Sequence, residues 1–152
     1  MLMLWTCLFQ VGKSKLSKNI VWKSANACVA VASVLAILIS TLFFRGESSE
    51  MILMPFHSFI EVQTEPEIYR SMLMNMFLFF PLGLTLPHVL PEEWKHQVTI
   101  SILLALFFSA AIEYSQYYFS LGRAETDDVI CNTLGAAIGT LSYTLERKFF
   151  TK

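Results

Sequence analysis

Residues 97–122 read QVTISILLALFFSAAIEYSQYYFSLG, a run of 26 residues whose single charged side chain is Glu113. Each residue of an α-helix adds about 1.5 Å, so this run is long enough to cross the hydrocarbon core of a bilayer, which is about 30 Å thick. Two stretches on its N-terminal side, 24–44 and 71–91, each contain 21 residues and no Asp, Glu, Lys or Arg. The sequence therefore predicts helices that span a membrane.

A fourth apolar stretch has 17 residues, which is the short end of the range for a spanning helix. We expect an all-α integral membrane bundle of four transmembrane helices, at about 24–44, 71–91, 97–121 and 129–145. Together they form one membrane domain, 24–146. The preceding residues 1–23 are expected to be a cytoplasmic or interfacial segment, because their apolar part, Met1–Val11, is too short to cross a bilayer.

The composition excludes several functional classes. Hydrophobic residues make up 55% of the 152 residues and charged residues 15%, with a mean hydropathy of +0.54, whereas soluble domains contain about 25% charged residues. Eleven basic residues against twelve acidic ones give a net charge of -1, so no global basic field indicates nucleic-acid binding. The three cysteines and three histidines lack the spacing of a disulfide framework or a metal site, so the sequence predicts no metal and no cofactor.

The distribution of basic residues predicts the topology. Eight of them flank one side of the four expected spans and three flank the other side. The first group is Lys13, Lys15, Lys18, Lys23, Lys95, Arg147, Lys148 and Lys152, and the second is Arg45, Arg70 and Arg123. Because positive residues next to spans are retained in the cytoplasm, we expect a multi-pass protein with both termini cytoplasmic. Segments 45–70 and 122–128 then face outward.

The outward segment 45–70 contains an apolar part interrupted by Pro55. This pattern is typical of a piece that lies in the headgroup layer or enters the membrane only partway. The simplest interpretation of its acidic residues is a solvated rim, formed by Glu47, Glu50, Glu61, Glu65 and Glu67.

Glu113 is the first candidate for a functional residue. A carboxylate inside a span costs several kcal/mol unless it is paired, protonated or next to water. Gln116 follows three residues later, so both side chains leave the helix on nearly the same face. The structural alternative is an interhelical hydrogen-bond pair that fastens the bundle.

Four further polar residues are expected near Glu113 at the outer end. Arg123 and Asp128 lie between the third and fourth spans, and Asn132 follows Asp128 by one helical turn on the same face. Asn75 occurs early in the second span, which starts on the outer side in the predicted topology. Structural alternatives are a packing hydrogen bond for Asn75, an N-cap of the fourth helix for Asp127 or Asp128, and a counter-ion to that cap for Arg123.

Small residues and prolines predict how the helices pack. Gly135 and Gly139 form a small-xxx-small pair, which lets another helix approach closely. We expect that helix to be the one that carries Glu113. Pro81 and Pro87 each free a backbone carbonyl four residues earlier in the second span and are expected to bend it.

Three pieces of this pattern, in order and spacing, resemble the VanZ-like membrane proteins. The pieces are Asn75-x-x-x-Phe79-x-Pro81-x-Gly83, then Glu113-x-x-Gln116 with Arg123 and Asp128 downstream, and Asn132-Thr-Leu-Gly135-x-x-x-Gly139. The resemblance covers roughly residues 50 to 145. It implies a small multi-span protein of the bacterial plasma membrane, in a family named for a member linked to resistance to the glycopeptide antibiotic teicoplanin. It also implies that the residues matched here are the ones that carry the site and the packing.

The leading hypothesis is a binding protein with an outward-facing polar pocket formed by Asn75, Glu113, Gln116, Arg123, Asp128 and Asn132. Its partners would be membrane lipids, a cell-wall lipid precursor or a glycopeptide antibiotic, and it would modulate susceptibility to glycopeptides and lipoglycopeptides. The Arg123 fork would contact phosphate or carboxylate.

Two alternatives come from other classes. One is an intramembrane enzyme on a lipid-linked substrate, with Glu113 as general acid or base. No nucleophile accompanies a base at helical spacing and none of the familiar hydrolase or phosphate-binding motifs is present, so the sequence favours a binding protein over an enzyme. The other is a structural subunit of a larger membrane complex.

Overall fold

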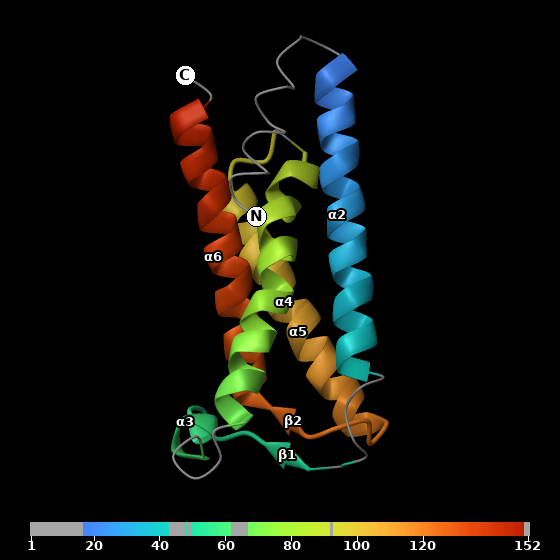
Figure 1. Cartoon of the computed structure of the whole chain (residues 1–152), viewed down its shortest axis with the longest axis vertical. Helices are drawn as coiled ribbons and strands as arrows, with labels where there is room; N and C mark the ends of the chain where they lie inside the picture. Colours follow the sequence, from blue (N-terminus) through green and yellow to red (C-terminus); the bar gives the residue numbers. More distant parts are fainter. Residues whose placement is uncertain (1–16, 43–47, 49, 62–66, 92, 151–152) are drawn as a thin grey trace.

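Four long helices run alternately in opposite directions and form an elongated bundle (Figure 1). This computed structural model describes residues 17–42, 48, 50–61, 67–91 and 93–150. The elements are α2 (Ser17–Leu42), β1 (Met51–Ile52), α3 (His57–Glu61), α4 (Glu67–Val89), α5 (Gln97–Tyr118), β2 (Ala124–Glu125) and α6 (Thr126–Phe150). The prediction of an all-α bundle is confirmed, with one short pair of strands added at its lower end.

Three helices are long and apolar enough to cross a membrane: Val21–Leu42, Glu67–Val89 and Gln97–Tyr118, with mean hydropathies of 2.2, 1.5 and 1.8. Among the described residues, α6 does not meet the same criterion. Its first turn carries Asp127 and Asp128, and glycine, threonine, serine and asparagine replace larger apolar residues along its length. A fourth crossing by α6 is therefore not confirmed and stays a prediction.

The helix ends differ from the predicted span ends in both directions. Helix α2 begins at Ser17, inside the predicted N-terminal segment 1–23, whereas residues 1–16 lie outside the described residues. Helices α4 and α6 also begin before the predicted starts at 71 and 129, and α5 ends at Tyr118 rather than at 121. Hydropathy marks the apolar part of a helix, whereas backbone hydrogen bonds continue into polar turns at the membrane surface.

The closest helix packing in the bundle joins α4 and α6. A Cβ added at Gly83 of α4 would collide with the backbone of Ala136, and Cβ atoms added at Gly135 and Gly139 would collide with the backbone of Met76 and of Phe80. The prediction that Gly135 and Gly139 face the helix carrying Glu113 is therefore wrong. They face α4, because Gly83 there offers the complementary gap.

Pro81 and Pro87 both lie inside α4. A proline has no N–H, so Pro87 leaves the carbonyl of Gly83 without its usual helical donor. The hydroxyl of Thr140 on α6 lies 3.0 Å from this carbonyl and 2.8 Å from the carbonyl of Ala136 in its own helix, so its single proton is shared between the two acceptors. In hydrocarbon an unsatisfied carbonyl costs several kcal/mol, so this shared contact helps α4 to accommodate the proline.

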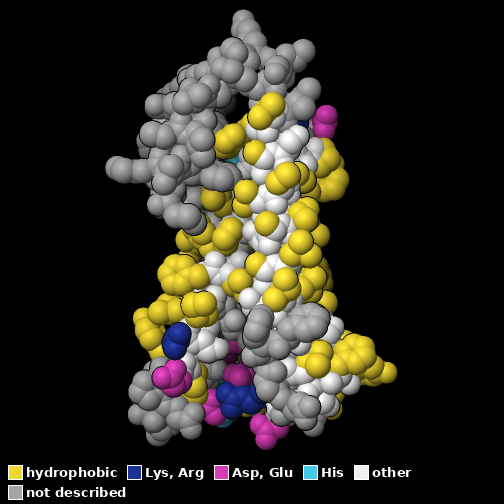
Figure 2. Space-filling model, turned by 45° about the vertical axis from the view of Figure 1, so that its right-hand side comes forward, with side chains coloured by type: hydrophobic (Ala, Val, Ile, Leu, Met, Phe, Trp, Pro, Cys, Tyr) yellow, Lys and Arg dark blue, Asp and Glu magenta, His cyan; other side chains and the backbone are white. Residues whose placement is uncertain are grey.

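Strand β1 and helix α3 lie at the lower end of the bundle (Figure 1). Strand β1 pairs in parallel with β2, so that Met51 lies opposite Ala124 and Ile52 opposite Glu125. The apolar side chains around α3 stay exposed; they are Leu53, Met54, Phe56 and Ile60. On the face shown in Figure 2, hydrophobic side chains run along the helices, and acidic and basic side chains gather at the lower end.

Candidate functional site

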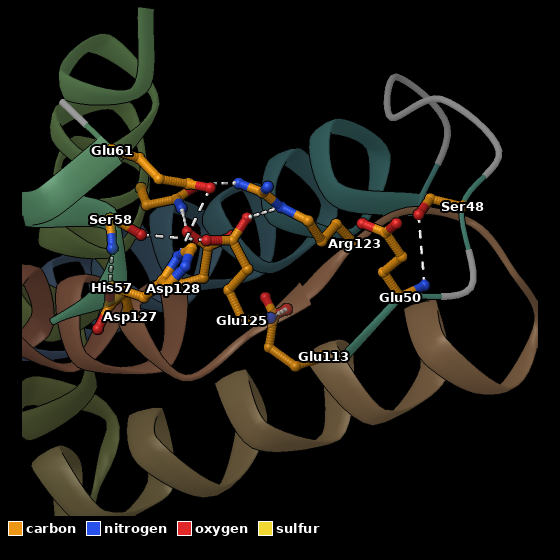
Figure 3. A network of polar contacts seen from close by, with 11 residues as sticks. Ser48, Glu50, His57, Ser58, Glu61, Glu113, Arg123, Glu125, Asp127 and Asp128 are labelled. Carbon is orange, nitrogen blue, oxygen red and sulfur yellow. Dashed lines mark hydrogen bonds and ion pairs between the residues drawn. The ribbon is translucent and has the colours of Figure 1, made fainter. Parts of the chain in front are cut away.

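Polar side chains from α3, α5, β2 and α6 meet at the lower end of the bundle (Figure 3). The sequence places them far apart, and the pairing of β1 with β2 brings them together. The hydrogen-bonded residues at this end are called the outer network below, after the predicted topology. They are Ser58, Glu61, Asn75, Glu113, Arg123, Glu125, Asp127 and Asp128.

Arg123 is held by two carboxylates. Its Nε donates to Oε1 of Glu125 across 2.7 Å, and one of its terminal nitrogens donates to Oε2 of Glu61 across 3.1 Å. Burial alone would lower the pKa of Arg123, but the hydrogen bonds and negative charges of Glu125 and Glu61 raise it above its ordinary value. Arg123 therefore carries its positive charge permanently. The interpretation of Glu61 as part of a solvated rim is wrong, because its carboxylate is engaged in this pair.

Asp127 fixes the turn that leads into α3. Its two carboxylate oxygens accept hydrogen bonds from the backbone N–H groups of Phe56, at 2.6 Å, and Ser58, at 2.7 Å. Phe56 adopts a positive φ of 64°, which is unfavourable for a bulky residue and persists only when surrounding contacts hold it. The expected role of Asp127, a cap on its own helix, is replaced by this contact with a segment about 70 residues earlier in the chain.

Asp128 and Asn75 join α6 to α4 at this end of the bundle. The amide nitrogen of Asn75 donates to Oδ1 of Asp128 across 2.6 Å, and both side chains are buried. One turn further along α6, the amide of Asn132 donates to the hydroxyl of Ser109 on α5 across 2.8 Å. The two contacts tie α6 to both of its neighbours.

Glu113 and Gln116 reach different partners although they share a helix face. Oε2 of Glu113 accepts a hydrogen bond from the backbone N–H of Glu125 across 3.0 Å. The amide nitrogen of Gln116 donates to the carbonyl of Thr41 across 2.7 Å, in the last turn of α2. Carbonyls in the last turn of a helix lack a helical donor, so Gln116 satisfies one of them.

The structure brings the predicted site residues together to different degrees. Asn75 and Asp128 are in direct contact, and Glu113 and Arg123 are linked through Glu125, whose backbone bonds to one and whose carboxylate bonds to the other. Asn132 and Gln116 lie beside the outer network and bond to Ser109 and Thr41. Pro81, Gly83, Gly135 and Gly139 lie at the α4–α6 contact described above.

The sequence does not predict that Ser58, Glu61 and Glu125 belong to the outer network. Ser109 was visible in principle, because it precedes Glu113 by one helical turn on the same face. Ser58 and Glu61 gave no such signal, since their positions depend on the strand pairing. Among the described residues, no group of three or more His, Cys, Asp and Glu side chains is arranged to hold a metal ion.

Comparison with known proteins identifies the family. A family model described as VanZ/LLP1 matches residues 16–147. The chain is also 34% identical over 80 residues to the protein VanZ of Enterococcus faecium, an alignment that covers 53% of this chain and 48% of that relative. The chain thus spans about half the length of the curated relative it matches. No solved structure matches. The family match covers most of the chain and agrees with its three apolar helices, so this membrane protein belongs to the VanZ/LLP1 family.

Proposed function

We propose that this protein crosses the bacterial plasma membrane four times, with both termini in the cytoplasm, and binds the headgroup of a membrane lipid or a cell-wall lipid precursor at its outer network. Binding there modulates susceptibility to glycopeptide and lipoglycopeptide antibiotics. The observation that carries the proposal is the burial of Glu113, Asp127 and Asp128 at one end of an otherwise apolar bundle. Buried carboxylates in a membrane protein are costly, and such groups mark ligand sites.

The arrangement of α6 supports the fourth crossing. This helix has 25 residues and packs along α4 for much of its length, antiparallel to α5. The start of α2, the loop that carries Lys95 and the end of α6 lie at the end of the bundle opposite the outer network (Figure 1). Among the described positions, five basic residues flank the helices at that end, as expected for the cytoplasmic side: Lys18, Lys23, Lys95, Arg147 and Lys148.

Family membership supports the proposed effect on antibiotic susceptibility. The VanZ-like family takes its name from a member linked to teicoplanin resistance, and four residues of the resemblance belong to the outer network: Asn75, Glu113, Arg123 and Asp128. A protein that occupies a headgroup at the outer surface would change how a cell-wall-directed antibiotic reaches its lipid-linked target.

The experiment compares the teicoplanin susceptibility of a sensitive Gram-positive host with and without the full chain. We expect the chain to lower susceptibility and both Glu113→Gln and Arg123→Gln to abolish the effect. Glu67→Gln is the matched control, because it removes an exposed carboxylate in the first turn of α4 outside the outer network. Equal susceptibility with and without the protein, or full protection by both variants at normal protein levels, would contradict the proposal.

A further inference from the structure

The short helix α3 carries polar and apolar side chains on opposite sides. Ser58 is 2% exposed, and its hydroxyl donates to Oε2 of Glu125 across 3.1 Å. Glu61, one turn further along, accepts a hydrogen bond from Arg123. Both side chains therefore point into the outer network. Ile60 lies on the other side of the helix and is exposed. The polar side of α3 thus faces the protein, and its apolar side faces away.

The exposed apolar surface of α3 continues into the turn before it. Leu53, Met54, Phe56 and Ile60 are each between 59% and 70% exposed, and these four side chains are called the apolar patch below. A surface helix in water turns its apolar residues inward and its polar residues outward. The arrangement here is the reverse, which is expected where the surroundings are apolar. An exposed patch of this kind marks a surface that contacts a membrane or another protein.

Hydrogen bonds from a distant part of the chain hold the turn that carries the apolar patch. Both carboxylate oxygens of Asp127 on α6 accept from the backbone of this turn, at Phe56 and at Ser58. The positive φ of Phe56, 64°, is costly for a bulky residue and is retained only where surrounding contacts impose it. The fold therefore fixes a turn that keeps apolar side chains exposed.

The apolar patch lies beside the helices that cross the membrane, at the end where their aromatic side chains gather. Helix α3 packs against α4, which begins at Glu67 and is apolar enough to span a bilayer (Figure 1). Tyr69 near the start of α4 is exposed, as are Tyr114 and Tyr118 near the end of α5. Exposed aromatic side chains are typical of the level at which spans leave the hydrocarbon. The patch therefore continues the lipid-facing surface of these helices.

We propose that the apolar patch is a membrane anchor, whose side chains insert into the leaflet at this end of the bundle, at the boundary between headgroups and acyl chains. Lipid is the occupant, because the patch adjoins the surface by which the spans contact lipid. The hydrogen bonds on the polar side of α3 then lie at the depth of the headgroups. The anchor requires neither a bound headgroup nor an effect on antibiotics, so it goes beyond the proposed function.

The test measures the depth of spin labels on the full chain in phospholipid nanodiscs, after the native cysteines are replaced by serine. The labels are attached to Leu53→Cys and Ile60→Cys. Their collision rates with oxygen, which enters hydrocarbon, and with a water-soluble nickel chelate give the depth. We expect both labels to lie about 5–10 Å below the membrane surface. Glu50→Cys is the matched control, because it replaces an exposed carboxylate three residues before Leu53 and should be reached by the chelate. Phe107→Cys, exposed midway along α5, gives the reading for the hydrocarbon interior.

Three readings would overturn the proposal. Labels that the chelate reaches as readily as it reaches Glu50→Cys would place the apolar patch in water. Low collision rates with both reagents would show that protein covers the patch, and would replace lipid by a second copy of the chain. Depths equal to that of Phe107→Cys would place the patch in the hydrocarbon interior. If one labelled chain loses its helical circular dichroism, Met54→Cys supplies a further position on the patch. Failure of the antibiotic experiment above would change none of these readings.

Discussion

The carboxylate of Asp128 accepts a hydrogen bond of 2.6 Å from the amide of Asn75, and the two residues lie 53 positions apart in the chain. Neither residue is more than 6% exposed. The contact joins α4 and α6 at the end of the bundle that carries the outer network. Under the proposed function, stability and ligand binding depend on some of the same residues, so substitutions must be chosen to separate the two effects.

Asn75→Leu should destabilise the bundle by about 1–3 kcal/mol, because it leaves a buried carboxylate without one of its donors. Asp128→Leu in the same background should add less than it does alone, since the double variant no longer contains the carboxylate that lost this donor. Reversible unfolding in mixed micelles measures the free energy of unfolding of the native chain, the two single variants and the double variant. Strictly additive losses would show that the two residues contribute independently, and the control is Ser115→Ala, which removes an exposed hydrogen bond within α5.

Gly83→Ala should weaken the contact between α4 and α6, because the new methyl group would overlap the backbone of Ala136. Overpacking of this kind costs about 1–3 kcal/mol. Gly139→Ala should have a similar effect through the backbone of Phe80. Ala110→Val adds volume at an exposed position of α5 and should leave the unfolding free energy nearly unchanged. Unaltered stability of both glycine variants would contradict the close approach.

Thr140→Val should cost about 1 kcal/mol, because it removes the hydroxyl whose proton is shared by the carbonyls of Gly83 and Ala136. The loss should shrink when Pro87→Ala is introduced first, since alanine restores the N–H that α4 lacks at this position. Thermal unfolding of the native chain, the two single variants and the double variant gives the interaction free energy between the two substitutions. If Thr140→Val costs the same in both backgrounds, the hydroxyl does not compensate for the proline.

Arg123→Gln should lower stability only modestly, by about 1 kcal/mol or less, because its ion pairs are partly exposed. The folded-state pKa of Arg123 is raised, so its contribution is present below its unfolded pKa and is lost only at higher pH. The difference in melting temperature between the native chain and Arg123→Gln should therefore stay constant between about pH 7 and pH 10. A difference that declines within this range would contradict a permanently charged arginine.

Topology is tested by cysteine labelling in intact cells, after the three native cysteines are replaced by serine. A reagent that does not cross membranes should modify Glu67→Cys, at the end of the bundle that carries the outer network. It should not modify Lys95→Cys, at the opposite end, until the cells are permeabilised. The reverse pattern would place the outer network at the cytoplasmic face and remove the cell-wall interpretation.

The sequence predicts the helices because their length and hydropathy are local properties. It singles out Glu113 because a charge within an apolar run is costly wherever the run folds. It does not predict which helix Gly135 and Gly139 approach, since a small-residue pair fits several neighbours and the choice depends on Gly83 elsewhere in the chain. The sequence does not predict the partner of Asp127 either. That partner lies about 70 residues earlier in the chain, and its position depends on the pairing of β1 with β2.

The parallel pairing of Met51 with Ala124 also sets an order for biosynthesis. Strand β1 leaves the ribosome well before β2, and two helices must be inserted between them before the ladder can close. Until then β1 is an unpaired edge and the turn at Phe56 lacks the carboxylate of Asp127. The closed end of the bundle is therefore among the last parts to assemble, and a nascent chain truncated before α6 should expose the segment 50–61 to protease.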